Sequence, residues 1–244
     1  MDWVSRILGE AAVGPKRDEI DHLKKVISDV YASSESARNF AQNLSMALTK
    51  ILGIYVRVRT VYPAQPAGGN AYFGLSPKPD SYAEIPFSGF AQWGPPPMIS
   101  LDIPEDYSEK DHESLVSILV HELVHIEQYK RQRAKGSDPQ SVFSAQKNRH
   151  TKGKSVFKVR SPASDPVGYY NSKVELMPRA KEYVDALRRS GMSTSEILNT
   201  LKKGLPRENV THRGVHRGAF YDVRNPESIR RFLKYAADYA QQSG

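Results

Sequence analysis

The sequence contains no cysteine, which excludes both a disulfide framework and a metal site built on thiolates. It also lacks any run of 18 consecutive apolar residues, so we expect no membrane-spanning helix and no membrane partner. The first fourteen residues lack a basic start followed by a long apolar run, and we therefore expect no secretory signal. Together these absences favour a reducing compartment, and we predict a cytoplasmic protein.

Positive charge is confined to one part of the chain. Residues 129–160 hold ten Lys/Arg against a single acid, Asp138, whereas the rest of the chain holds 25 basic and 26 acidic residues. The net charge of +8 therefore belongs to this segment rather than to the fold. Such a segment can contact nucleic acid or an acidic partner, or it can be a solvated loop, and the sequence leaves these interpretations open.

Helical and alternating periodicities succeed one another along the chain. Strands are expected at 53–62 and 98–103, and the proline-rich stretch between them, 63–97, indicates hairpins and long loops with strand-like pieces at 71–75 and 82–87. Helices are expected at 18–50 (in two parts, with a break at 32–36), from 108 to about 136, at 169–191, after 193 and at 226–241.

The helix from Ser108 carries the most informative pattern. Ser108 and Asp111 form a capping-box-like start, Gly136 is a plausible stop, and apolar residues fall at nearly every angle around the axis, which is typical of a buried helix. Two histidines, His121 and His125, lie in the middle of this apolar run within "HELVH". Their presence there requires a reason.

Residues i and i+4 of a helix lie about 40° apart around its axis, so the imidazoles of His121 and His125 project from one face and can bind one ion. Glu122 lies about 100° from His121, where its carboxylate can reach a water on the ion. This H-E-x-x-H pattern predicts Zn²⁺ with Glu122 as the catalytic base. Two histidines bonded to backbone carbonyls are the alternative, but burying them with two acids and no ion would be costly.

A catalytic zinc site takes a third protein ligand and keeps one position open. Glu175, near the start of the helix at 169–191, is the preferred candidate, although Ser172 and Glu175 also fit a capping box. His150, in the basic segment, is the main rival, and Glu182 is a weaker one.

HELVH on a buried helix, with a strand before it and a glutamate-bearing helix after it, resembles the zincin metallopeptidases, in particular the gluzincin branch. The stretch "YYNSKVELMPRA" is similar to a Tyr-x-Asn-x-Pro-x-Glu pattern of predicted phage and bacterial metallopeptidases, from which Lys173 and Pro178 depart. Because proline cannot donate a helical hydrogen bond, the helix should be kinked or begin later. The resemblance covers roughly residues 98–190. SprT-like DNA-associated proteases use a later histidine as the third ligand, so His150 remains an alternative to Glu175.

The resemblance implies an α+β, zincin-like fold, in which a small twisted sheet accompanies the buried H-E-x-x-H helix and a C-terminal helical part carries the third ligand. We expect one catalytic domain made of residues 1–136, a basic insertion at 137–166 and the helical part at 167–244. In zincins an edge strand before the active helix pairs with the extended substrate, and the strand at 98–103 is in the right place for this role, with one more core strand as the alternative.

The expected function is hydrolysis of peptide bonds in a peptide or protein substrate, with Zn²⁺ on His121, His125 and Glu175 and with Glu122 as base. Tyr170 is the candidate donor to the oxyanion, and the other candidates are Tyr169, His212, His216 and Tyr221. A phage-encoded member would act in the host cytoplasm or the virion. The alternatives are a virion-type structural protein with a structural or vestigial metal, and a nucleic-acid-associated protease.

Overall fold

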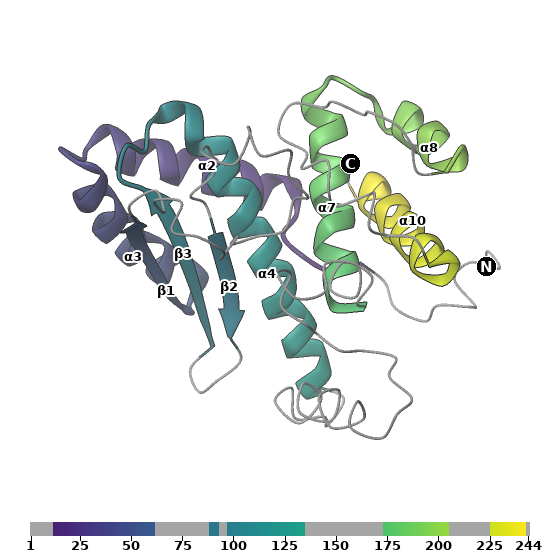
Figure 1. Cartoon of the computed structure of the whole chain (residues 1–244), viewed down its shortest axis with the longest axis horizontal. Helices are drawn as coiled ribbons and strands as arrows, with labels where there is room; N and C mark the ends of the chain where they lie inside the picture. The colour runs from purple at the N-terminus through teal and green to yellow at the C-terminus, as the bar shows by residue number, and fades with distance from the viewer. Residues whose placement is uncertain (1–11, 62–87, 93–96, 135–172, 205–224, 243–244) are drawn as a thin grey trace, which may run out of the picture. The chain divides into compact units, whose positions relative to one another are not determined.

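The computed structural model describes residues 12–61, 88–92, 97–134, 173–204 and 225–242 (Figure 1). These residues combine helices with one small sheet, which is compatible with the predicted α+β class. They fall into two compact units: residues 15–61, 88–92 and 97–134 form the first, and residues 12–14, 173–204 and 225–242 form the second. Within the described ranges, no helix has the length and apolar character needed to cross a membrane.

The first unit begins with two helices, α2 (Arg17–Ala32) and α3 (Ala37–Leu52), which confirm the predicted two-part helix. Ser36 caps the start of α3, since its hydroxyl accepts a hydrogen bond from the Asn39 amide at 3.2 Å. Gly53 ends α3 in the left-handed region, with φ of 64°, and turns the chain back along the helix.

The sheet contains β1 (Tyr55–Val61), β2 (Ser88–Gln92) and β3 (Met98–Pro104) in the order β1-β3-β2. β1 runs parallel to β3, and β2 runs antiparallel to it. As the alternation predicts, every second residue of β1 and β3 is buried in the core, and the intervening residues at the start of β1 are exposed. The buried residues are Val56, Val58, Ile99, Leu101 and Ile103. The two predicted strands are therefore confirmed.

The expected edge position of the strand at 98–103 is wrong, because β3 is the middle strand and pairs on both sides. Its second neighbour, β2, lies within the stretch predicted as hairpins and loops. The β2 sequence, SGFAQ, has too few branched or apolar residues to stand out by alternation. The strand-like pieces expected at 71–75 and 82–87 lie outside the described residues.

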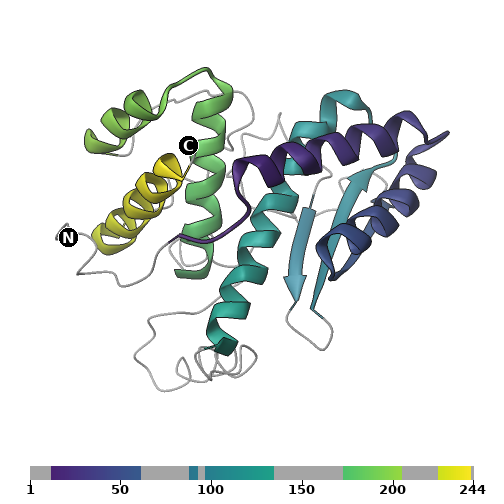
Figure 2. The ribbon, with the colours of Figure 1, turned by 180° about the vertical axis from the view of Figure 1, so that it is seen from behind.

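Two hydroxyl groups of α3 cover the outer edge of β1, along which α3 runs (Figure 2). Ser45 Oγ accepts a hydrogen bond from the Val58 amide at 2.8 Å, and Thr49 Oγ1 accepts one from the Val56 amide at 3.0 Å. Thr49 also donates to the Val56 carbonyl at 3.2 Å. The four residues from Ser45 to Thr49 rise about 6 Å along the helix, close to the spacing of two residues along a strand, so the two hydroxyls take the place of a neighbouring strand at these positions.

The central helix α4 (His112–Ala134) follows a single 3-10 turn, η2 (Glu109–Asp111). The predicted cap is present, since the Asp111 carboxylate accepts hydrogen bonds from the Ser108 amide and hydroxyl, each at 2.9 Å. All eight residues from 119 to 126 are buried, which confirms the prediction of a buried helix. Gly136, the predicted stop, lies outside the described residues.

An aromatic cluster joins the start of α4 to α2 and α3. The Phe40 and Tyr107 rings stack with centroids 4.6 Å apart, and the His112 ring lies 4.9 Å from Tyr31 and 5.6 Å from Tyr107. Burial lowers the pKa of His112, because it disfavours the charged imidazolium, although nearby carboxylates oppose this effect. The cluster therefore holds a neutral imidazole at neutral pH.

We predict that His112 makes the stability of the first unit sensitive to mild acid. Its pKa in the folded state lies below the unfolded value of about 6.5, so its contribution is present above that pH and is lost as the pH falls through the folded pKa. Urea unfolding between about pH 7 and pH 5 should show that the difference in free energy of unfolding between the wild type and His112→Gln becomes smaller as the pH falls. A difference in free energy of unfolding that does not depend on pH would contradict the lowered pKa of His112.

The second unit contains α7 (Lys173–Arg189), α8 (Thr194–Lys202) and α10 (Pro226–Gln241), in agreement with the three predicted helices. The Ser193–Glu196 capping box begins α8. Asn225 caps α10 by accepting from the Glu227 amide at 2.8 Å, and Pro226 occupies the first helical position. α7 begins at Lys173 and continues past Pro178 to Arg189, and residues 169–172 of the predicted helix lie outside the described residues.

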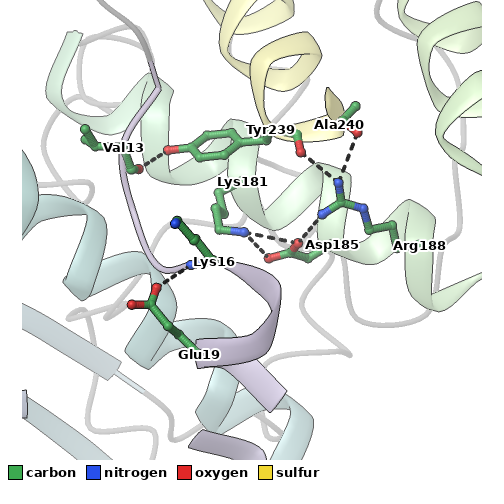
Figure 3. A network of polar contacts seen from close by, with 8 residues as sticks. All are labelled: Val13, Lys16, Glu19, Lys181, Asp185, Arg188, Tyr239 and Ala240. Carbon is green, nitrogen blue, oxygen red and sulfur yellow. Dashed lines mark hydrogen bonds and ion pairs between the residues drawn. The ribbon is translucent and has the colours of Figure 1, made fainter. Parts of the chain in front are cut away.

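A buried polar network joins α7 to the end of α10 (Figure 3). Asp185 lies 3.3 Å from the Lys181 ammonium and 3.4 Å from the Arg188 guanidinium. Arg188 donates to the carbonyl groups of Tyr239, at 2.7 Å, and Ala240, at 3.3 Å, so it binds the C-terminal carbonyls of α10. The Lys181 side chain is only 4% exposed, and burial lowers its pKa despite the nearby Asp185 carboxylate.

We predict that Asp185→Ala destabilises the second unit by about 2–3 kcal/mol, because it leaves two cations without their shared carboxylate. This lies below the cost of breaking a fully buried pair, since the Asp185 side chain is 18% exposed. Lys181→Met should cost less, because it removes the buried charge itself. Urea unfolding midpoints give the comparison, and a larger loss for Lys181→Met than for Asp185→Ala would contradict it.

Candidate metal centre

His121 and His125 occupy successive turns of α4, and both are buried. Their Nε2 atoms lie 3.1 Å apart. Two nitrogen ligands of a tetrahedral zinc ion, with bonds of about 2.0–2.1 Å, lie roughly 3.3–3.4 Å from each other. The helix therefore holds the two imidazole nitrogens close to the separation that a shared ion requires.

Gln128, one turn beyond His125, fixes the orientation of that imidazole. The His125 Nδ1 atom lies 3.0 Å from Gln128 Oε1. Because an amide oxygen only accepts, Nδ1 carries the proton and Nε2 presents its lone pair. Sequence analysis missed this residue, although the i+3 spacing from His125 on a helix could have indicated it.

Glu175 is buried in the first turn of α7. Arg179, one turn later, has its Nε 3.9 Å from Glu175 Oε2 and its Nη1 4.0 Å from Glu182 Oε2. These separations exceed hydrogen-bond lengths but allow electrostatic attraction. The guanidinium thus lies between two of the carboxylates that the sequence puts forward as third ligands.

The structure brings together His121, His125 and Glu175. Their ligand atoms all lie within 4.8 Å of one another, and the three side chains are buried, so the group could hold a metal ion. Two imidazole nitrogens and one carboxylate oxygen are a donor set that suits zinc and other divalent transition metals. Within the described ranges this group includes Glu175 but not Glu182, and His150 lies outside those ranges.

Of the other predicted site residues, Glu122 lies within the described ranges and the candidate oxyanion donors do not. Glu122 is buried on α4 beside His121. The candidate oxyanion donors lie outside the described residues, as does most of the basic segment; these donors are Tyr169, Tyr170, His212, His216 and Tyr221. At the described start of the basic segment, Lys130 pairs with Glu127 at 2.6 Å on the surface of α4.

Comparison of the chain with protein-family models, curated proteins and solved structures gives no match.

We predict that Gln128 contributes to metal affinity through His125. The wild type should bind about one Zn²⁺ per chain, measured by competition with a chromophoric chelator, and His121→Ala should abolish this binding. Gln128→Ala should weaken it by about 10–100-fold, the usual effect of removing the partner of a ligating histidine.

Gln128→Glu provides the matched control, because a carboxylate also accepts from Nδ1 and should retain most of the affinity. Circular dichroism should show that all these variants keep their helices. Unchanged zinc affinity in Gln128→Ala would mean that the contact with His125 has no role in metal binding.

Proposed function

We propose that the protein is a zinc-dependent metallopeptidase with a zincin-like fold. One observation carries the proposal: the Nε2 atoms of His121 and His125 lie 3.1 Å apart on a buried helix, with the Glu175 carboxylate in the same metal-competent group. Glu122, which follows His121 directly, supplies a buried carboxylate beside that group. The arrangement fits the H-E-x-x-H chemistry that the sequence predicts.

His121, His125 and Glu175 would act as ligands, leaving one coordination position for water or substrate. A zinc ion bound there supplies a Lewis acid that polarises a carbonyl and makes water a nucleophile at neutral pH. Gln128 keeps the His125 lone pair directed at the site.

Glu122 would act as the base. It accepts a proton from the attacking water as a bond forms between the water oxygen and the scissile carbonyl carbon. When the carbon–nitrogen bond breaks, Glu122 returns that proton to the leaving amine. Tyr170 is the proposed donor to the developing oxyanion, and this assignment rests on the sequence alone.

The order of the strands favours substrate binding beside β2 rather than beside the strand at 98–103. β3 pairs on both sides, and α3 hydroxyls cover the outer edge of β1. Within the described residues, β2 has a paired strand on one side only. An extended peptide would therefore add beside β2, through main-chain hydrogen bonds.

We predict that Glu122→Gln keeps the metal and the fold but lowers peptide hydrolysis by several orders of magnitude, because it removes only the proton transfer. Cleavage of labelled casein and of a mixed peptide library measures the effect. Glu127→Gln is the control, since this glutamate lies on the same helix with a 40% exposed side chain. Equal activity in Glu122→Gln and the wild type would exclude Glu122 as base.

Metal affinity tests the third ligand separately. Glu175→Ala should weaken zinc binding, whereas His150→Ala should leave it unchanged, and the reverse result would favour the SprT-like arrangement. A zinc-loaded wild type that cleaves none of these substrates would contradict the peptidase assignment and favour a structural metal.

A further inference from the structure

A groove runs between α3 and β1 in the first unit, with a volume of about 690 Å³. It lies wholly within one unit and is separate from His121 and His125. Exposed side chains of the helix and the strand line it, including Arg38, Met46 and Lys50 from α3 and Tyr55, Arg57 and Arg59 from β1.

The lining of the groove is positively charged. Residues 36–61, which supply the whole lining, contain four Arg/Lys and no Asp or Glu. Arg59 is neutralised by Asp102 on β3, which accepts hydrogen bonds from its Nε and, at 3.1 Å, from its Nη2. Arg38, Lys50 and Arg57 keep their charge for a ligand, because the described residues offer them no ion pair.

The three cations lie along the groove rather than at one point. The contacts of Ser45 with Val58 and of Thr49 with Val56 show that β1 runs back along α3. Lys50 therefore lies near the start of β1, Arg38 lies near its end, and Arg57 lies between them. Arg38 and Lys50 are twelve residues apart, about 18 Å along the helix. This is a linear array of positive charge.

Apolar side chains are exposed at the same place. The large hydrophobic residues exposed within the described ranges are Met46 (59%), Ile51 (42%) and Tyr55 (50%). Met46 and Tyr55 line the groove, and Ile51 follows Lys50. Exposed apolar groups gathered on one face are typical of a binding surface.

The backbone of β1 limits what this surface can bind. Because Ser45 and Thr49 already accept from the Val58 and Val56 amides at this edge, these amides are not open to an additional strand. The ligand must be held by side chains, with anionic groups repeated along its length and flat apolar groups between them. A nucleic-acid duplex keeps its bases stacked inside, whereas a single strand offers both phosphates and open base faces.

We propose that the groove between α3 and β1 binds single-stranded nucleic acid, with phosphates on Arg38, Lys50 and Arg57 and a base against Tyr55. The proposal is independent of the metallopeptidase assignment and of the basic segment at 129–160. It predicts binding that is insensitive to sequence and weakened by salt.

Fluorescence anisotropy of a labelled oligo-dT with the full chain, between about 50 and 200 mM salt, tests this. Neutralising Arg38, Lys50 and Arg57 together to Gln should lower the slope of log affinity against log salt by about two units, at roughly 0.7 per phosphate contact. Tyr55→Ser should weaken binding about fivefold or more and leave the slope unchanged, because it removes only stacking.

The matched control neutralises Arg17, Lys25 and Lys202, three cations outside the groove, and should change binding far less. Circular dichroism checks the fold. If the triple variant does not fold, the effects of Arg57→Gln and Tyr55→Ser on oligo-dT binding test the proposal in its place. Zinc removal should not affect binding, which separates this result from peptidase activity.

Three results would overturn the proposal. The wild type could fail to bind oligo-dT even at the lowest salt. Binding could survive the groove variants and instead be lost when Lys147, Arg149, Lys152, Lys154 and Lys158 are neutralised, which would assign it to the basic segment. A labelled oligo-glutamate peptide could bind through the groove cations while oligo-dT does not, which would make the partner an acidic protein.

Discussion

The burial of two imidazoles on one helix is the constraint on which the proposed site depends. Polar side chains removed from water must be compensated, and the middle of α4 places His121, Glu122 and His125 within eight consecutive buried residues. Gln128 satisfies one ring nitrogen of His125, and the two Nε2 atoms face each other at 3.1 Å. Without an ion, one of these nitrogens must donate to the other; with an ion, both present lone pairs to it. The pair is therefore compatible with a hydrogen bond between the two rings and could also hold a metal ion together with Glu175.

A buried helix can hold such a pair only if its own position is fixed. The Ser108–Asp111 cap sets where α4 begins, and the cluster of Tyr31, Phe40, Tyr107 and His112 packs that end against α2 and α3. The sheet completes the unit, and α3 closes one edge with two hydroxyl groups. Polar contacts thus fix the start of α4 and the outer edge of β1, while the buried middle of α4 carries the ionisable groups.

Sequence periodicity predicted much of this arrangement. The helices, the strands β1 and β3, the cap at Ser108 and the buried character of α4 all follow from local patterns. The strand order did not follow, because β2 is short and weakly patterned and pairing between distant segments leaves no local signal. Ser45 and Thr49 escaped notice for the same reason: a hydroxyl on a helix resembles any surface residue until its strand partner is known.

The candidate sites differ in how far the sequence could define them. His121 and His125 are four residues apart, so helical geometry alone predicts that they meet, whereas Glu175 is fifty residues later and needed a resemblance to be preferred. The groove of α3 and β1 was missed although all its cations lie within residues 36–61, because four charges spread over 26 residues do not raise the local charge density as residues 129–160 do. Only the return of β1 along α3 converts them into a line. Charge counted along the chain therefore identified a segment, while charge placed by the fold identifies a surface, and the two need not bind the same partner.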